Sequence, residues 1–168
     1  MIPAQTRRAP PALPEALRRE VEDFHAAYAD TLDRGDIEAW PEFFTEDAVY
    51  RVIARDNLEA GLPLCLMLCE GKGMLKDRAY AIAHTEMYAP RYLQHQISLI
   101  RVTAFDDAKV SAQANYVLFE TLVDEPTRIL QVGRYRDTFA RTEGGLLLAE
   151  RLCVYDSVTV PNCMVFPA

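Results

Sequence analysis

The sequence predicts an α+β protein in which helices come first and a long antiparallel sheet follows. Apolar residues recur at helical spacing in the first half, and four long β-type runs fill the second half. The turns between these runs are short and rich in Asp, Pro or Gly, and turns of hairpin length join antiparallel neighbours. Strands of this length that curl around the first helix would form a cone with helices on one face.

The first helix is expected to begin at Pro14 and to stop at Gly35, because proline suits a first helical turn and glycine ends a helix. One apolar stripe at helical spacing runs along it, made of Leu17, Val21, Phe24, Tyr28 and Leu32. Residues 1–14 hold four prolines and are expected to form an extended arm. Residues 15–168 are expected to form one domain.

The remaining elements follow from the same signals. A short helix, IEAWPEFF, is expected before a first strand, AVYRVI, and residues 54–63 are expected to be irregular. The segment LCLMLCE is either a short strand or a buried turn of helix. A third helix is expected over about 73–88, and the four long strands over about 92–105, 109–123, 128–141 and 146–160.

The last predicted strand is apolar on both faces, yet Glu150 and Arg151 stand in its middle. Adjacent strand residues point to opposite faces, so each charge needs its own partner. Arg134, Arg136 and Asp137 on the preceding strand are the expected cross-strand neighbours. We interpret these five residues as structural, fixing the register of the sheet or the specificity of a subunit contact.

Composition excludes several classes of function. The net charge of −7, without a basic stripe, argues against nucleic-acid binding. No apolar run is long enough to span a membrane, and the first residues lack the apolar core of a signal peptide. The four cysteines stand among apolar residues and are expected to be buried and reduced. Together these observations predict a cytoplasmic protein.

The chain is not expected to carry a metal centre. It has no Cys-x-His motif, and its three histidines lie in separate predicted elements, so neither a Rieske cluster nor a mononuclear iron site is indicated. A metal-free acid–base site is the alternative. His95, Tyr50, His25 and Tyr28 could converge inside a cone, with Asp47 as a base. The simpler interpretation is that His95 is a strand residue satisfied by a local hydrogen bond.

Four segments carry a family resemblance through their order and spacing: DIEAWPEFFTEDAVYRV, GMLKDR, RYLQHQISLIRV and GRYRDTFARTEGGLLLAERLCVYDS. They resemble the small (beta) subunit of Rieske-type aromatic-ring-hydroxylating dioxygenases, such as the terephthalate, anthranilate and benzoate enzymes. The resemblance spans about residues 15–168. It implies a nuclear-transport-factor-2-like cone and a structural role in the catabolism of aromatic acids.

The resemblance also implies a partner. The large (alpha) subunit would hold the Rieske [2Fe–2S] cluster and the mononuclear iron. The small chain would trimerise within a hetero-hexamer of three large and three small chains. Near the C-terminus, Met164 and Phe166 are apolar and either pack on the chain's own core or contact a subunit.

Two other hypotheses stay open from the sequence: a stand-alone cone-fold dehydratase or isomerase, and a module that binds a small ligand. The interior of the cone discriminates both from the scaffold, and a ligand-binding module would differ from a catalyst in lacking an acid–base pair. A catalyst or a ligand-binding module needs an open interior cavity, whereas a scaffold can fill its cone.

Overall fold

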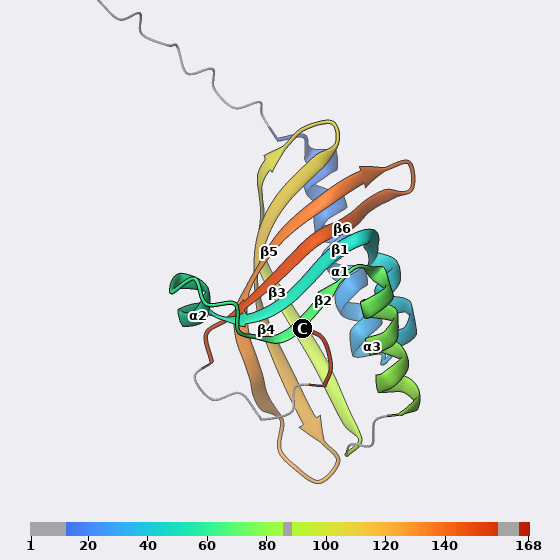
Figure 1. The fold of residues 1–168 in the computed structure, drawn as a ribbon, viewed down its shortest axis with the longest axis vertical. Coiled ribbons are helices and arrows are strands. Elements are labelled where there is room, and N and C mark those ends of the chain that lie inside the picture. The colour runs from blue at the N-terminus through green and yellow to red at the C-terminus, as the bar shows by residue number, and fades with distance from the viewer. Residues whose placement is uncertain (1–12, 86–88, 158–164) are drawn as a thin grey trace, which may run out of the picture.

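Six strands form one strongly curved sheet with α1 and α3 beside it, in a computed structural model that describes residues 13–85, 89–157 and 165–168 (Figure 1). The elements, in chain order, are α1 (Glu15–Asp33), the 3-10 helix η1 (Ile37–Phe43), β1 (Phe44–Ala54), α2 (Arg55–Glu59), β2 (Cys65–Glu70), α3 (Lys72–His84), β3 (Arg91–Phe105), β4 (Lys109–Leu122), β5 (Arg128–Thr142) and β6 (Gly145–Tyr155). The predicted α+β class is confirmed. None of the helices described is long and apolar enough to cross a membrane.

The strand order in the sheet is β2-β1-β6-β5-β4-β3. Strands β3 to β6 form the antiparallel meander that the short turns predict. Strand β1 differs, because it pairs in parallel with β6 and antiparallel with β2. Parallel neighbours need a long connection, and here two helices and four strands separate β1 from β6 along the chain. The LCLMLCE segment is a strand, β2, and it forms one edge of the sheet.

Several elements differ from the sequence prediction. Strand β6 ends at Tyr155, before its predicted end at 160, and residues 158–160 of that end lie outside the described residues. Strand β1 begins at Phe44, four residues earlier than predicted. The segment predicted to be irregular contains the short helix α2. Helix α3 is described up to His84, and residues 86–88 of its predicted end lie outside the described residues. The short helix before β1 is a 3-10 helix with Pro41 inside it.

Strand β6 is apolar on both faces, and its inner face is covered along its length while its outer face is covered at one end. Its inner side chains, among them Leu148 and Cys153, are fully buried in the core that α1 closes. On the outer side, α2 packs over the ends of β1 and β6, where Ile53 and Val154 are buried (Figure 1). Burial of an aliphatic side chain contributes about 1.5–3 kcal/mol. Helix α1 thus covers the inner face, whereas α2 covers the outer face only near Val154, and Leu147 and Leu152 on that face stay half-buried.

Gly133 marks the tightest place in the sheet. A Cβ atom there would lie 2.8 Å from the ring of Tyr116 and closer still to the main-chain carbonyl oxygen of Val154. We expect Gly133→Ala to lower the free energy of unfolding by about 2 kcal/mol, because β6 or Tyr116 must shift. Urea denaturation measures this loss. Gly144→Ala is the control, since only a side-chain atom 3.8 Å away faces that position; equal stability of the two variants would contradict the prediction.

Candidate functional site

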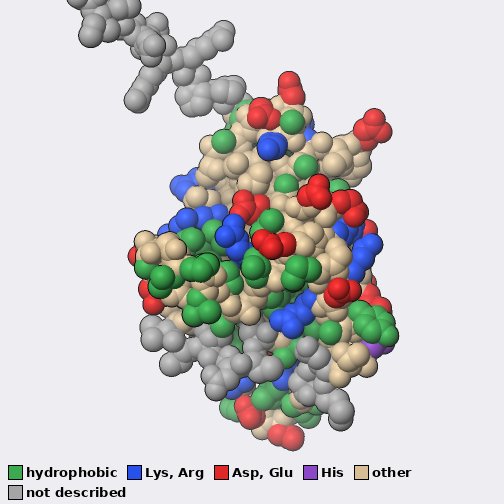
Figure 2. All heavy atoms as spheres, viewed as in Figure 1, with side chains coloured by type: hydrophobic (Ala, Val, Ile, Leu, Met, Phe, Trp, Pro, Cys, Tyr) green, Lys and Arg blue, Asp and Glu red, His purple; other side chains and the backbone are tan. Residues whose placement is uncertain are grey.

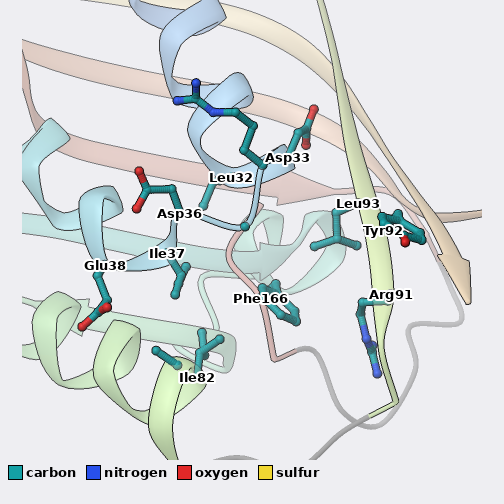
Figure 3. A pocket seen from close by; sticks show the side chains of 13 residues that line it. Leu32, Asp33, Asp36, Ile37, Glu38, Ile82, Arg91, Tyr92, Leu93 and Phe166 are labelled. Atoms are coloured by element: carbon teal, nitrogen blue, oxygen red, sulfur yellow. The ribbon is translucent and has the colours of Figure 1, made fainter.

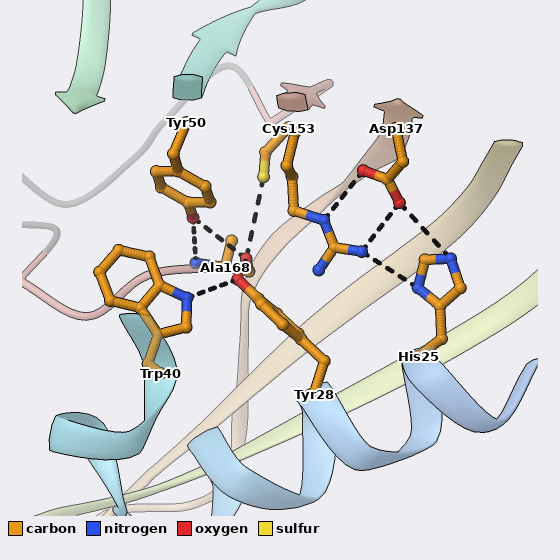
Figure 4. Close-up of polar contacts among 8 residues, drawn as sticks. His25, Tyr28, Trp40, Tyr50, Asp137, Cys153 and Ala168 are labelled. Atoms are coloured by element: carbon orange, nitrogen blue, oxygen red, sulfur yellow. Dashed lines mark hydrogen bonds and ion pairs between the residues drawn. The ribbon is translucent and has the colours of Figure 1, made fainter. Parts of the chain in front are cut away.

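A cluster of polar side chains lies inside the curved sheet, where a cone-fold enzyme would hold its substrate (Figure 4). Helix α1 supplies His25 and Tyr28, β1 supplies Tyr50, β5 supplies Asp137, and β6 supplies Arg151. Each of these side chains is buried. Buried polar groups need partners, so the hydrogen bonds of this cluster decide what it can do.

Arg151 and Asp137 form its centre. They are direct cross-strand neighbours in the β5–β6 register. Nε of Arg151 donates to Oδ1 of Asp137 at 2.9 Å, and Nη2 donates to Oδ2 at 2.8 Å. This is the bidentate geometry that is common between arginine and a carboxylate. The guanidinium also lies between the rings of Tyr28 and Tyr135, 4.1 and 4.2 Å from their centroids.

Electrostatics keeps this pair ionised. Burial alone would lower the pKa of Arg151, but the charge of Asp137 and its hydrogen bonds raise it well above the ordinary value. Arginine is already charged at every pH at which proteins fold. The guanidinium of Arg151 is therefore a fixed positive charge, and it has no proton to exchange.

His25 completes the group as a neutral imidazole. Burial, and then the charge of Arg151, lower its pKa from 6.5 to about 4, against the opposing effect of Asp137. Its Nδ1 lies 3.2 Å from Nη2 of Arg151, which can only donate, so Nδ1 accepts and the proton is on Nε2. Nε2 is 3.4 Å from Oδ2 of Asp137, within ion-pair distance but without hydrogen-bond geometry. The side chain is only 1% exposed, so it has no route to a substrate.

The lowered pKa of His25 predicts a pH dependence of stability. Between about pH 4 and 6.5 the unfolded chain binds a proton that the folded chain excludes, so stability falls as the pH falls. The shift corresponds to about 3 kcal/mol in full. Chemical denaturation from pH 7 to pH 4 measures it, with His25→Asn, which keeps an acceptor for Arg151, as the comparison. Parallel pH profiles for the two proteins would show that His25 is not responsible.

Residues 165–168 enter the same interior. The main-chain oxygen of Ala168 accepts hydrogen bonds from the hydroxyls of Tyr28, at 3.0 Å, and Tyr50, at 3.1 Å. The N–H of Ala168 donates to the Tyr50 hydroxyl at 2.8 Å, and the indole of Trp40 donates to Tyr28 at 2.9 Å. Ala168 itself is fully buried (Figure 4). The chain thus occupies the centre of its own cone.

The remaining groups of the interior are held in their protonated forms. Burial raises the pKa of Tyr28 and of Tyr50 well above the usual value, so both are phenols. Burial raises the pKa of Cys153 to about 12, and its Sγ lies 3.8 Å from the Ala168 oxygen. A thiol in this state is a poor nucleophile. The predicted burial holds for Cys69 and Cys153, Cys65 is half-buried, and Cys163 lies outside the described residues.

Only three of the five proposed acid–base residues converge. His25, Tyr28 and Tyr50 meet in the interior, whereas Asp47 is exposed on β1. His95 pairs instead with Asp33, whose Oδ1 lies 2.6 Å from Nδ1 and whose two oxygens accept from the His95 backbone N–H at 3.0 Å. Asp33 is eight residues beyond His25, which separates them by about 12 Å along the helix. His95 therefore lies toward the mouth of the cone, where its side chain is fully buried and its Nε2 has no hydrogen-bond partner among the described residues.

A pocket of about 490 Å³ opens at this mouth, between the end of α1, η1, α3 and the start of β3 (Figure 3). Asp33, Glu38, Arg91, Tyr92 and Phe166 are among its lining residues. His95 does not line it, and Arg91 already pairs with the buried Glu120 at 2.7 Å. Two charged residues at this pocket, Arg91 and Asp33, are thus already engaged within the chain, by Glu120 and His95.

The predicted interface residues divide between two sides of the sheet. Asp137 and Arg151 are buried within the protomer, so a role at a subunit surface does not apply to them; the cross-strand partner predicted for Arg151 is present. Glu150 lies on the outer face and pairs with Arg51 at 2.9 Å. Arg134 and Arg136 are exposed on the same face. Phe166 is half-buried at the pocket, and Met164 lies outside the described residues.

The sequence did not place three residues of the interior, namely Trp40, Ala168 and Glu120. Trp40 and Ala168 gave no local signal for their part in the cluster. Glu120, a buried carboxylate held by Arg91 and Arg128, did give one, because it continues the alternation of buried residues along β4. Among residues 13–85, 89–157 and 165–168, no three His, Cys, Asp or Glu side chains are grouped so that they could hold a metal ion.

The curved sheet around an N-terminal helix defines a nuclear-transport-factor-2-like protein, and the SnoaL-like domain family matches residues 16–152. The chain is 31% identical to the anthranilate 1,2-dioxygenase small subunit of Burkholderia cepacia over 140 residues, covering 83% of this chain and 87% of that one. It is 32% identical to terephthalate 1,2-dioxygenase, terminal oxygenase component subunit beta 1, of a Comamonas species, covering 88% and 96%.

A solved structure agrees with these relatives. A protein from Novosphingobium aromaticivorans, assigned as the beta subunit of an aromatic-ring-hydroxylating dioxygenase, superposes with a TM-score of 0.83 at 36% identity, covering 90% of this chain and 95% of that one. The chain belongs to the small subunits of aromatic-ring-hydroxylating dioxygenases, within the SnoaL-like family.

Proposed function

We propose that this chain is a non-catalytic scaffold that holds the catalytic large subunits of an aromatic-acid dioxygenase in position. The observation that carries the proposal is the filled interior. Arg151 and Asp137 are neutralised by each other, and Ala168 occupies the space beside Tyr28 and Tyr50. A dehydratase or isomerase needs an open polar cavity beside its acid–base groups, and here Ala168 fills the space beside Tyr28 and Tyr50.

The partner in this proposal is the large subunit, and the assembly is a cytoplasmic hetero-hexamer of three large and three small chains. The names of the relatives support it, since they are subunits of dioxygenases and, for the Comamonas protein, of a terminal oxygenase component. The Rieske cluster and the mononuclear iron are expected on the large chain. This chain would fix the distance between neighbouring large chains.

Purification from the native host tests the proposal. A tag on this chain should recover a brown complex that contains a larger chain in equal copies, as shown by native mass spectrometry and iron analysis. A colourless oligomer of this chain alone would contradict the scaffold function and favour a dehydratase or isomerase.

The scaffold function also predicts the activity of two variants. Tyr50→Phe and His95→Gln remove the two polar groups that the acid–base hypothesis needs most. Turnover per assembled complex should stay within about twofold of the wild type, since neither group would meet the substrate. Steady-state rates, normalised to iron content, measure this. Loss of a general acid or base would instead cost about 100-fold or more with assembly preserved.

A further inference from the structure

Residues 165–168 run from the mouth of the cone into its interior. Phe166 is half-buried and lines the mouth pocket beside Ile82 and Leu93 (Figure 3). Ala168, two residues further on, is fully buried inside the cone (Figure 4). These four residues lie outside the helices and strands of the fold, and we name them the strap.

The interior recognises the strap by its main chain. The carbonyl oxygen of Ala168 accepts from the hydroxyls of Tyr28 and Tyr50 at 3.0 and 3.1 Å, and its N–H donates to the Tyr50 hydroxyl at 2.8 Å. Every residue except proline offers these two main-chain groups. The place of the Ala168 side chain is fully buried, so it selects only for small size. Main-chain hydrogen bonds combined with a restricted place for a side chain are a common way to bind an extended peptide.

The walls of this site are held by contacts that do not involve the strap. The indole of Trp40 donates to the Tyr28 hydroxyl at 2.9 Å, and its ring meets that of Tyr50 edge to face with centroids 5.2 Å apart. The guanidinium of Arg151 lies 4.1 Å from the centroid of the Tyr28 ring. These contacts connect η1, α1, β1 and β6. The two hydroxyls are therefore preorganised for an acceptor whether or not the strap is in place.

The apolar residues of the strap face the chain's own core. Val165 and Pro167 are buried, and Phe166 packs against the core cluster. Exposed apolar side chains gather elsewhere, over α2 and β2, where Leu62 and Leu64 are 53% and 72% exposed (Figure 2). The strap thus resembles a ligand seated in the cone.

Two features allow the strap to leave. The mouth pocket of about 490 Å³ opens beside Phe166, so the ring has space on the solvent side. The strap also lies outside the sheet, whose strands are joined by continuous ladders of hydrogen bonds. Segments joined to a fold by few hydrogen bonds open at a lower free energy than the whole domain unfolds.

We propose that the strap is an exchangeable occupant of the cone. It leaves the interior and returns as a unit while the sheet stays folded, and the vacated site binds a short extended peptide with a small residue at the position of Ala168. The open state uncovers the hydroxyls of Tyr28 and Tyr50 and the thiol of Cys153, whose Sγ lies 3.8 Å from the Ala168 oxygen. The inference goes beyond the proposed function, because a scaffold could serve with a strap that never opens.

Labelling of Cys153 in the full-length chain tests the opening. An aromatic disulfide is added at increasing urea below the unfolding transition, and the labelled cysteine is identified by mass spectrometry. Opening of the strap alone exposes little surface, so the labelling rate should change by no more than about twofold at low urea and rise steeply only near the transition. A rate that rises steeply from the first addition of urea would show that Cys153 is reached through global unfolding, and would overturn the inference.

Two substitutions at one position test what the site accepts. Ala168→Leu should expel the strap, since a fully buried place has no room for a larger side chain, and should raise the labelling rate about tenfold or more with the circular dichroism of the sheet unchanged. Ala168→Gly keeps both main-chain groups and should label within about threefold of the wild type. Equal rates for the two variants, or loss of the sheet signal in Ala168→Leu, would contradict an exchangeable strap.

A peptide added in trans tests the vacated site. Acetyl-Val-Phe-Pro-Ala, at millimolar concentration, should slow the labelling of Cys153 in the Ala168→Leu chain toward the wild-type rate. The same peptide with N-methylalanine at its last position lacks the N–H that the Tyr50 hydroxyl accepts, and should protect about tenfold less well. Absence of protection by the first peptide would show that the interior does not bind peptides. Equal protection by both would show that it does not recognise the main chain, and either result would overturn the inference.

Discussion

Arg151→Ala is expected to lower the free energy of unfolding by about 3–5 kcal/mol, which is the usual cost of removing one partner of a buried ion pair. In the wild-type chain both oxygens of the Asp137 carboxylate accept hydrogen bonds from Arg151. The substitution therefore leaves this carboxylate buried without its counter-charge. It also removes the cation from between the rings of Tyr28 and Tyr135. Urea denaturation of the purified chain at pH 7 measures the loss.

The outer face of the same sheet offers a matched control. Arg51 and Glu150 also pair across neighbouring strands, at 2.9 Å, but their side chains are 40% and 43% exposed. Arg51→Ala should therefore cost no more than about 1 kcal/mol. Arg151→Met combined with Asp137→Leu should recover most of the loss, because apolar residues of similar size can replace a buried pair. Similar losses for Arg51→Ala and Arg151→Ala would show that burial does not set the cost.

Glu150 and Arg151 of β6 show what the alternation of side chains along a strand can predict and what it cannot. Alternation alone predicted that Glu150 and Arg151 face opposite sides, and it gave Arg134, Arg136 and Asp137 together as the candidate neighbours across the strand. It did not predict which of the two is inside. That choice depends on α1, which brings His25 and Tyr28 to the Arg151 side. Local pattern thus determined the pairing, and tertiary packing determined the burial.

Contacts between segments that are far apart in the sequence could not be predicted, and this limited the prediction of both the sheet and the site. The meander of β3 to β6 follows from short turns, but the parallel pairing of β1 with β6 joins segments about 100 residues apart and has no local signal. For the same reason, His95 could not be placed relative to His25. Both face inward, yet the length of α1 puts one in the interior and the other at the mouth. The entry of Ala168 into the cone was likewise invisible in the composition of the C-terminal segment.

Most of the polar interior has a structural explanation that needs no substrate, although His25 Nε2, the Tyr135 hydroxyl and Arg151 Nη1 are buried without a hydrogen-bond partner among the described residues. Each hydroxyl of Tyr28 and Tyr50 is engaged by the chain itself, and the charge of Arg151 is matched by Asp137. Catalytic sites in cone folds must leave such groups accessible, because binding and proton transfer require contact. Here the same types of residue are used to close the interior, and closure is what gives a scaffold a rigid core.

Deletion of residues 165–168 is expected to lower the free energy of unfolding by about 4 kcal/mol and to open this interior. Three hydrogen bonds to Ala168, each worth about 1 kcal/mol, are lost, and the burial of Val165 is lost with them. Urea denaturation measures the first effect. The second is measured at Cys153, whose thiol lies beside the Ala168 oxygen and should become reactive toward an aromatic disulfide, with the labelled cysteine identified by mass spectrometry.

Val165→Ala is the control for this deletion. It removes apolar surface but leaves the backbone of Ala168 in place, so it should cost about 1 kcal/mol and leave Cys153 protected. The difference between the two variants isolates the part played by the main-chain hydrogen bonds to Tyr28 and Tyr50. If the deletion costs no more than Val165→Ala and Cys153 stays unreactive, residues 165–168 do not fill the cone, and the argument for a closed scaffold loses its main support. If Cys153 becomes reactive while the shortened chain still captures the large subunit, then the interior and the assembly surfaces are independent parts of the same fold.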